Sequence, residues 1–291
     1  MKTKTKIILY LSLALFAISI PSKATEDRTA DKNKLNIATF NLRMDTPSDG
    51  VNAWPNRKEM VKGLIRFHDF DIFGTQEGFK HMLDDIAELD GYAYIGAGRD
   101  DGKDGGEHSA IFYKTARFQL LDNGNFWFSE TPDVPGKGWD ATCCNRICSW
   151  GKLRDKDNYK EFYFFNVHYD HQGKVARRES SKLLLARINQ IAGSTNTIFV
   201  TGDFNAVPTD EPIVVLAKDG FLKDSYTISE QPCYGTVGTS NGFKIDIDAK
   251  NRIDYIWVTA DIKVKKYGVL NDMQNGRFPS DHFPVLIEAE Y

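Results

Sequence analysis

Short apolar segments alternate with polar loops along most of the chain. Runs of aromatic and β-branched residues bounded by Gly, Pro, Asn or Asp are typical of strands, whereas apolar positions three and four residues apart are typical of helices. The strands predicted in this way cover residues 35–43, 70–77, 92–98, 109–113, 118–128, 145–153, 161–169, 197–203, 252–260, 262–270 and 283–291. The predicted helices cover residues 55–66, 79–89, 175–192 and 212–218.

The order of these elements predicts the fold class. Strand-helix-strand units occupy both ends of the chain, and the stretch 92–170 consists mainly of short strands. Because each apolar face must be buried against another layer, this order favours two packed, mixed β-sheets flanked by helices in one α/β domain. We expect the domain over 35–291, and the hydrophobic content of 41% is too high for a disordered chain.

The first residues have a different pattern. Three lysines precede an uncharged run over 7–20, and small residues follow at Ser22 and Ala24. This pattern predicts a signal peptide over 1–24, cut after Ala24, and therefore export to the periplasm or the medium. An uncleaved anchor is the alternative, but the apolar run is short for a membrane span, so no stable membrane insertion is expected. The polar stretch 25–34 is expected to be a flexible lead-in.

The charge balance bears on the kind of substrate. The whole chain has a formal net charge of -3, and removal of the four lysines in 1–24 would lower it to -7. An acidic protein is a poor non-specific binder of nucleic acid. Nucleic acid is therefore disfavoured as a partner but not excluded, because a bound divalent cation would add positive charge at a site.

Four cysteines follow the predicted signal peptide, at Cys143, Cys144, Cys148 and Cys233. In an oxidising compartment this even number permits two disulfides, with three possible connectivities. Free, partly buried thiols are the alternative. The spacing of the cysteines matches no zinc-binding pattern, so they do not indicate a zinc site.

Polar side chains gather at the ends of six predicted strands. They are Asn41, Glu77, His168, Asp170, His171, Asp203, Asn205, Asp254, Asp281 and His282. A single Asp or Asn after a strand is usually a turn former or a helix cap, but turns do not explain six such placements. In layered α/β folds, strand ends present side chains to a shared crevice. Carboxylate and amide oxygens are ligands of hard cations, so the set predicts a Mg²⁺ or Mn²⁺ site.

A hard cation beside Asp and His suits hydrolysis of phosphoesters. Such a cation polarises a phosphoryl oxygen, a carboxylate activates a water, and imidazole groups stabilise the growing negative charge. The blocks "TFNLR", "TQE", "NVHYDH", "GDFNAVP", "RIDYIWV" and "SDHFPV" appear in this order. Together they resemble the endonuclease/exonuclease/phosphatase superfamily over Leu35 to Tyr291. The resemblance implies a four-layer α/β sandwich and a metal-dependent hydrolase of phosphoester bonds.

The resemblance also implies roles for individual residues. Asn41, Glu77 and Asp281 match metal-site positions, with Glu77 as the principal carboxylate. The alternative for Asn41 is that it only forms a turn. Asp203 matches the acid that activates the attacking water. Asn205 matches the amide that fixes this water or the phosphate. Strand alternation would aim both side chains away from the intervening Phe204.

Three further residues match positions that act on the phosphate. His282 matches the phosphate-stabilising histidine and Asp254 its orienting partner, which would favour the charged imidazole. A strand-capping role is the alternative for Asp254. His168 matches a phosphate-contacting position between the two halves of the site.

Candidates for substrate binding lie near strand ends, in the Gly-rich loop 98–109 or near the start of the helix predicted over 175–192. They are Arg43, Arg99, Asp170, His171 and Arg177. As alternatives, Asp170 and His171 support the binding residues or are exposed to solvent. The alternative for Arg177 is a place on a solvent-exposed helix face.

The expected substrate is a small or medium phosphorylated molecule such as a phospho-sugar, an inositol phosphate or a nucleotide. A secreted nuclease is the alternative, since it would use the same site. A glycosidase or sugar-binding protein is the alternative of another class, but a glycosidase needs two carboxylates and no metal.

Overall fold

The computed structural model describes residues 32–291. The predicted signal peptide over 1–24 and most of the predicted lead-in lie outside the described residues. The first strand, β1, begins at Lys34, one residue before the expected start of the domain. No helix in the described part of the chain has the length and apolar character needed to cross a membrane.

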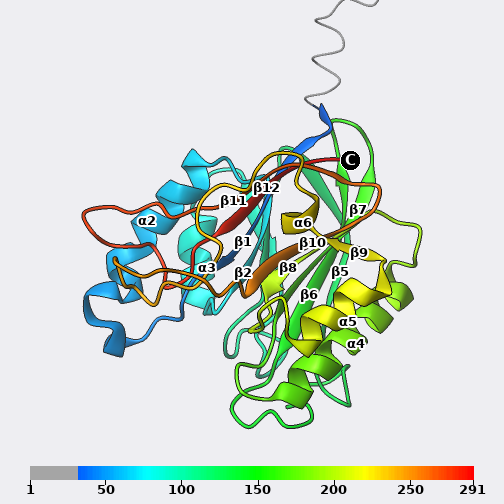
Figure 1. Cartoon of the computed structure of the whole chain (residues 1–291), viewed down its shortest axis with the longest axis horizontal. Coiled ribbons are helices and arrows are strands. Elements are labelled where there is room, and N and C mark those ends of the chain that lie inside the picture. The colour runs from blue at the N-terminus through cyan, green and yellow to red at the C-terminus, as the bar shows by residue number, and fades with distance from the viewer. Residues whose placement is uncertain (1–31) are drawn as a thin grey trace, which may run out of the picture. The chain divides into compact units, whose positions relative to one another are not determined.

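Two mixed β-sheets of six strands each form the centre of the described chain (Figure 1). The first sheet contains, in spatial order, β11 (Lys263–Val269), β12 (Val285–Glu290), β1 (Lys34–Asn41), β2 (Ile72–Gln76), β4 (Ile111–Lys114) and β3 (Tyr92–Ile95). The second contains β5 (Phe118–Trp127), β6 (Ile147–Asp155), β7 (Glu161–His168), β8 (Ile198–Asp203), β10 (Asp254–Thr259) and β9 (Leu222–Asp224).

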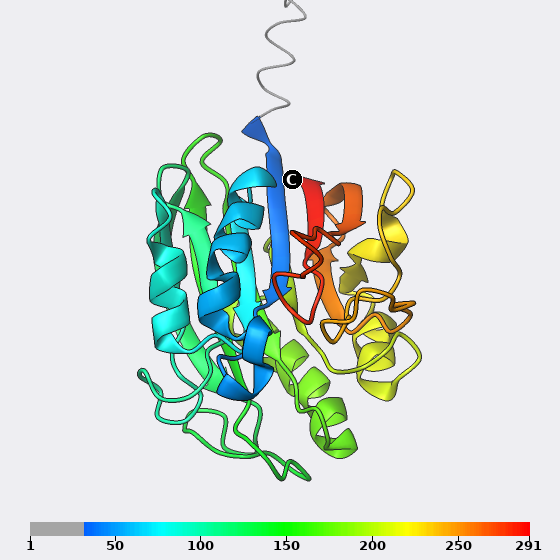
Figure 2. The same ribbon diagram turned by 90° about the vertical axis from the view of Figure 1, so that its left-hand side faces the viewer.

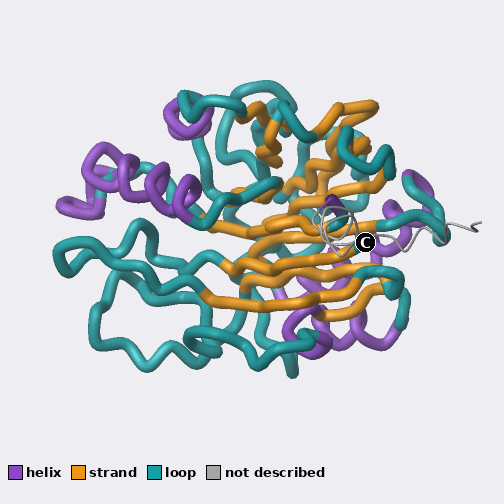
Figure 3. The backbone as a smooth tube through the Cα atoms, turned by 90° about the horizontal axis from the view of Figure 1, so that it is seen from above, coloured by secondary structure: helices purple, strands orange, loops and turns teal. Residues whose placement is uncertain are grey.

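Helices cover the outer face of each sheet. Helices α2 (Trp54–Phe67) and α3 (Lys80–Ala87) share an apolar core with the first sheet, and Figure 2 shows them over its face, in blue and cyan. Helices α4 (Lys174–Ile191) and α5 (Glu211–Asp219) pack in the same way on the second sheet. Figure 3 shows the strands in the centre and helices on the outside. The predicted four-layer sandwich is confirmed.

The strands pack on both faces because their side chains alternate in direction. In β1, Ile37 joins the core between the sheets, whereas Ala38 and Phe40 join the core beneath α2 and α3. Strands that are buried on both faces have nearly continuous apolar sequences, which explains why the sequence predicts their positions well. Three short elements escaped prediction, namely β9, the 3-10 turn η1 (Pro47–Asn52) and α6 (Ser225–Ile228).

Strand direction brings the polar strand ends to one edge of the sandwich. β7 and β8 are parallel, and their last residues, His168 and Asp203, are paired in register. β10 runs antiparallel to β8, so its first residue, Asp254, lies opposite Asp203. β1 and β2 are also parallel and end together at Asn41 and Gln76. Residues far apart in the sequence therefore meet at this edge.

A buried hydrogen-bond network joins the two sheets next to this edge. Asn166 of β7 donates from Nδ2 to the carbonyl oxygens of Thr75 and Ala110, at 2.8 and 2.9 Å. Its Oδ1 accepts from Gln76 Nε2 at 2.7 Å and from Thr201 Oγ1 at 3.0 Å. Because all four bonds are buried, the amide fixes how the strand ends of one sheet face those of the other.

Candidate active site

A cavity of about 360 Å³ opens at the edge where the strand ends meet. It is lined by Arg43, Met44, Glu77, Arg99, Glu107, Cys143, Cys144, Arg146, His168, His171, Asp203, Asn205, Asp281 and His282. Two further predicted residues, Asn41 and Asp254, are buried directly behind this lining and contact it. The structure therefore brings all eight predicted catalytic and metal-site residues together.

Asn41 links the acids of the two sheets. Its Nδ2 donates to Glu77 Oε1 and to Asp203 Oδ2, both at 3.0 Å, and its Oδ1 accepts from the backbone N–H of Arg43 at 2.9 Å. Since a cation binds the oxygen of an amide, ligation by Asn41 would need its side-chain amide to turn over. A plain turn role does not account for these contacts with two carboxylates.

Glu77 follows β2 in a left-handed backbone conformation, with φ of 62°. This conformation is uncommon for residues other than glycine and is often found at functional sites. Its Oε2 accepts from the backbone N–H of Met44 at 3.0 Å. Burial alone would raise the pKa of Glu77, but the Asn41 hydrogen bond, the charge of His282 and the Met44 N–H together lower it. Glu77 is therefore a stable anion in the cavity.

Asp203 lies at the centre of the site. Burial and the nearby charge of Asp254 raise the pKa of its carboxyl to about 7. Its Oδ2 lies 3.8 Å from Nε2 of His168 and 3.9 Å from Nε2 of His282. A carboxylate with a pKa near neutrality is suited to accept a proton from water.

The two histidines differ in charge. Burial would lower the pKa of His282, but the charge and the hydrogen bond of Asp254, at 2.9 Å, raise it well above the ordinary value. Burial, together with the charge of Arg146, lowers the pKa of His168 well below the ordinary value. The site therefore offers one charged and one neutral imidazole to an anionic group.

Asn205 reaches the cavity in a way that strand alternation did not predict. β8 ends at Asp203, and Asn205 lies beyond it with a left-handed φ of 49°. Its backbone N–H donates to Asp203 Oδ1 at 2.8 Å, and its Nδ2 donates to the carbonyl oxygen of Tyr169 at 3.0 Å. Asn tolerates this conformation, so a turn places the side chain. Phe204 packs in the core between Tyr169 and Tyr255.

The donor set fits a hard divalent cation. Ligand atoms of Glu77, His168 and Asp203 lie within 4.8 Å of one another. Asp203, Asp254 and His282 also lie this close together, but the charged imidazole of His282 is not a cation ligand. Oxygen atoms dominate the set, and two acids close together gain from a cation between them. Asp281 lines the same cavity but belongs to neither group, so its predicted ligand role stays a prediction.

Three of the five predicted substrate-binding residues line the cavity, namely Arg43, Arg99 and His171. Asp170 and Arg177 do not line it. Arg177 donates from Nη1 to the carbonyl oxygen of Asp170 at 2.9 Å. Asp170 in turn accepts backbone N–H bonds at the start of α4, so both residues support the loop that carries His171.

Arg146 was missed by sequence reasoning. It is buried, lines the cavity and donates from Nη2 to His171 Nδ1 at 2.8 Å. It immediately precedes β6, which runs antiparallel to β7, so it lies at the edge where β7 ends. The available signal was an arginine near the start of the strand predicted over 145–153.

The cysteines match neither sequence expectation. Cys143 and Cys144 form a disulfide between neighbouring residues, whereas Cys148 is a buried free thiol and Cys233 an exposed one. The four cysteines therefore form one disulfide, where the sequence permitted two, and the other two are free thiols. Cys148 is a free thiol inside β6, in the core beneath α4.

Known proteins with similar sequence and structure agree with this geometry. A structure of a mannosyl-6-phosphatase from Bacteroides thetaiotaomicron is 46% identical, covers 88% of this chain and 100% of its own, and has a TM-score of 0.84. An endonuclease/exonuclease/phosphatase family protein from the same organism is 45% identical over 89% and 98% of the two chains, with a TM-score of 0.86.

A more distant similarity reaches a nuclease. The 3'-5'-exoribonuclease subunit Ccr4 of the CCR4-Not complex of Emericella nidulans is 21% identical over 99% of this chain. The match spans only 57% of that protein's length, so it concerns one part of a longer chain.

The family model for the endonuclease/exonuclease/phosphatase family matches residues 38–282, which include every predicted catalytic and metal-site residue. Members of this family are metal-dependent hydrolases of phosphoester bonds, which sets aside the glycosidase alternative. From its matched sequence, its two-sheet fold and its relatives, the chain belongs to the endonuclease/exonuclease/phosphatase family.

Proposed function

We propose that the protein is an exported phosphatase, dependent on Mg²⁺ or Mn²⁺, that releases phosphate from a small phosphorylated molecule, with a sugar phosphate as the favoured substrate. One observation carries the proposal. Asp203, with a pKa near 7, and His282, kept charged by Asp254, lie 3.9 Å apart on one side of a cavity of about 360 Å³. A cavity of this size suits a small ligand.

Each residue of the site has its own role in hydrolysis. Asp203 accepts a proton from the attacking water, and the Asn205 amide helps to position that water. The charged imidazole of His282 donates a hydrogen bond to a phosphoryl oxygen, whose negative charge grows in the transition state. Asp254 holds the ring of His282 and does not contact the substrate. A cation held by Glu77 and the Asn41 amide would polarise a phosphoryl oxygen.

Two observations favour a sugar phosphate over nucleic acid. The formal net charge of -3 for the whole chain is unsuited to a polyanion. The mannosyl-6-phosphatase is also far more similar in sequence, at 46% identity, than the exoribonuclease, at 21%. The exoribonuclease similarity keeps a nuclease as the second candidate.

A substrate panel tests the proposal. Purified protein in Mg²⁺ is given mannose 6-phosphate, an inositol phosphate, a nucleoside monophosphate and a single-stranded oligonucleotide, each with and without EDTA. Phosphate release from the sugar phosphate that EDTA abolishes is expected. Cleavage of the oligonucleotide without hydrolysis of any small monoester would favour the nuclease instead.

Export is proposed from the amino-terminal pattern of lysines, uncharged residues and Ala24. The amino terminus of protein recovered from the periplasm or medium of an expressing bacterium checks it. We expect Thr25 as the first residue. Protein that stays inside the cell with Met1 intact would contradict export.

A further inference from the structure

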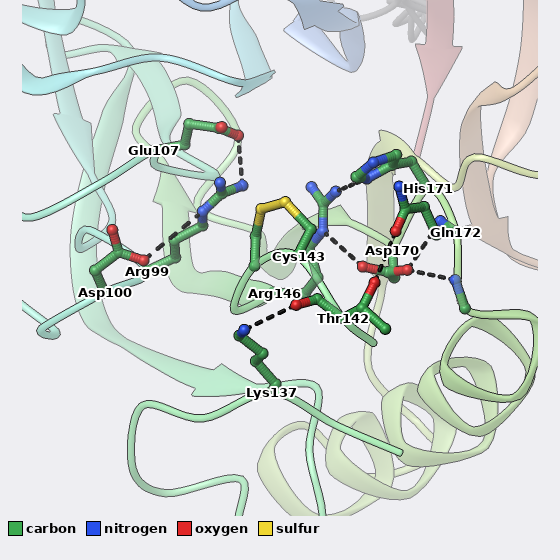
Figure 4. The surroundings of a disulfide bond; sticks show 12 residues. Arg99, Asp100, Glu107, Lys137, Thr142, Cys143, Arg146, Asp170, His171 and Gln172 are labelled. Atoms are coloured by element: carbon green, nitrogen blue, oxygen red, sulfur yellow. Dashed lines mark hydrogen bonds and ion pairs between the residues drawn. A yellow bond between two sulfur atoms is a disulfide. The ribbon is translucent and has the colours of Figure 1, made fainter. Parts of the chain in front are cut away.

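The disulfide between Cys143 and Cys144 forms part of the wall of the active-site cavity. The two cysteines line the same space as Asp203 and His282. Figure 4 shows the disulfide between the side chains of Arg99 and Arg146. Sulfur is polarisable and only a weak acceptor, so the linked pair presents an apolar surface within a cavity lined mainly by polar residues.

A buried guanidinium accompanies this apolar surface. Arg146 is 5% exposed, lines the cavity and donates from Nη2 to His171. Its Nη1 atom has no hydrogen-bond partner among the described residues. A buried donor is costly to leave unpaired, so Nη1 is suited to bind a ligand that enters the cavity.

The two guanidiniums beside the disulfide are paired with carboxylates. Arg99 pairs with Glu107 at 2.6 Å, and Arg146 Nε lies 3.7 Å from Asp170 Oδ2. Each of these two guanidiniums therefore has a carboxylate partner, which offsets its attraction for a second phosphate. A neutral, hydroxylated group fits these paired charges better than another anion does.

We propose that the Cys143–Cys144 disulfide is the platform for the ring of the substrate, and that Arg146 binds the hydroxyl groups at the rim of that ring. The proposal rests on the proposed sugar phosphatase function and adds the residues that recognise the leaving group. A sugar ring has an apolar C–H face and hydroxyl groups that accept hydrogen bonds. The disulfide and Arg146 match these two features, whereas Asp203 and His282 lie on the side that binds the phosphate.

A double variant, Cys143→Ser/Cys144→Ser, tests the platform, and Cys233→Ser is its matched control outside the cavity. Both are compared with the wild type on mannose 6-phosphate, which has a ring, and glycerol 3-phosphate, which has none. In the double variant, the ratio of kcat/KM for mannose 6-phosphate to kcat/KM for glycerol 3-phosphate should fall about tenfold. The fall should come from a higher KM for mannose 6-phosphate. The control should keep the wild-type ratio.

Inhibition by the two products separates loss of the platform from general damage. In the double variant, the inhibition constant of free mannose should rise, and that of inorganic phosphate should stay at the wild-type value. An unchanged substrate ratio, or equal rises of both inhibition constants, would overturn the platform. Should the double variant not fold, the same ratios are measured on wild-type protein before and after a phosphine reductant opens the disulfide.

The wild-type measurements distinguish failure of the platform from failure of the proposed function. A wild-type protein that hydrolyses no hexose phosphate would overturn the sugar phosphatase function and the platform with it. The platform alone would be overturned if the wild type hydrolyses mannose 6-phosphate and the double variant has the same ratio of kcat/KM values for the two substrates.

Discussion

The Nδ1 atom of His282 lies 2.9 Å from Oδ2 of Asp254, and both side chains are buried. The same Oδ2 accepts from Thr239 Oγ1 at 2.5 Å, which fixes the carboxylate on the far side of the ring from the cavity. Nε2 of His282 is left to face Asp203. Asp254 therefore sets both the orientation and the charge of the imidazole.

Replacing this carboxylate should change how activity depends on pH. The charge of Asp254 raises the pKa of His282, so the imidazole stays protonated as pH rises. Asp254→Asn should lower that pKa, and the alkaline limb of the kcat/KM profile should move to lower pH by about one unit or more. The profile of phosphate release against pH checks this.

Asp272→Asn is the matched control, since Asp272 pairs with His68 on the surface, at 3.0 Å. It should keep the wild-type profile. An Asp254→Asn profile that overlays the wild type would show that Asp254 does not set the charge of His282.

Asp203→Asn should remove most of the activity. The amide keeps the size of the side chain but cannot accept the proton of the attacking water, so kcat should fall by about 10²–10⁴-fold. Initial rates at saturating substrate measure the loss, and thermal unfolding confirms that the variant folds. A kcat within a factor of about three of the wild type would rule out Asp203 as the base.

Glu77→Gln should weaken the response to metal. Glu77 contributes a stable anion to the proposed cation site, and the neutral amide is a poorer ligand. The Mg²⁺ concentration for half-maximal activity should rise about tenfold or more. Glu88→Gln, at an exposed residue, is the control. Superimposable Mg²⁺ titrations for Glu77→Gln and the control would contradict ligation by Glu77.

Asn166→Ala should destabilise the fold rather than act on chemistry directly. It removes four buried hydrogen bonds between and within the sheets, leaving Gln76 Nε2 and two carbonyl oxygens with fewer partners. The free energy of unfolding should fall by about 2–3 kcal/mol, measured with denaturant. Asn123→Ala on the exposed side of β5 should change it little. Equal effects of the two variants would refute the bridging role of Asn166.

The main elements were predictable because burial leaves a simple pattern. The apolar run Ile198–Val200 and the polar Asp203 that follows it mark β8 and its end correctly. The meeting of Asn41, Glu77, Asp203 and His282 was expected from their positions at strand ends, through the family resemblance. Elements such as β9, with three residues, and α6, with four, are too short to show a periodic pattern of apolar and polar positions.

Other features depend on contacts between distant segments. Arg146 reaches the cavity because β6 pairs antiparallel with β7, and no local motif marks it. The left-handed backbone of Asn205 cannot be read from strand alternation. Arg177 supports Asp170 instead of lining the cavity, because the first turn of α4 presents its side chain to the preceding loop. These details follow from tertiary packing, which single-sequence patterns do not record.

The dependence of sugar phosphate hydrolysis on a divalent cation tests the central claim most directly. Protein stripped with EDTA and freed of chelator is assayed with mannose 6-phosphate, alone and after addition of Mg²⁺ or Mn²⁺. We expect no phosphate release from the stripped protein and recovery of activity with either cation, but no recovery in Asp203→Asn. Undiminished phosphate release by the stripped wild-type protein would contradict a metal-dependent site built around Asn41 and Glu77.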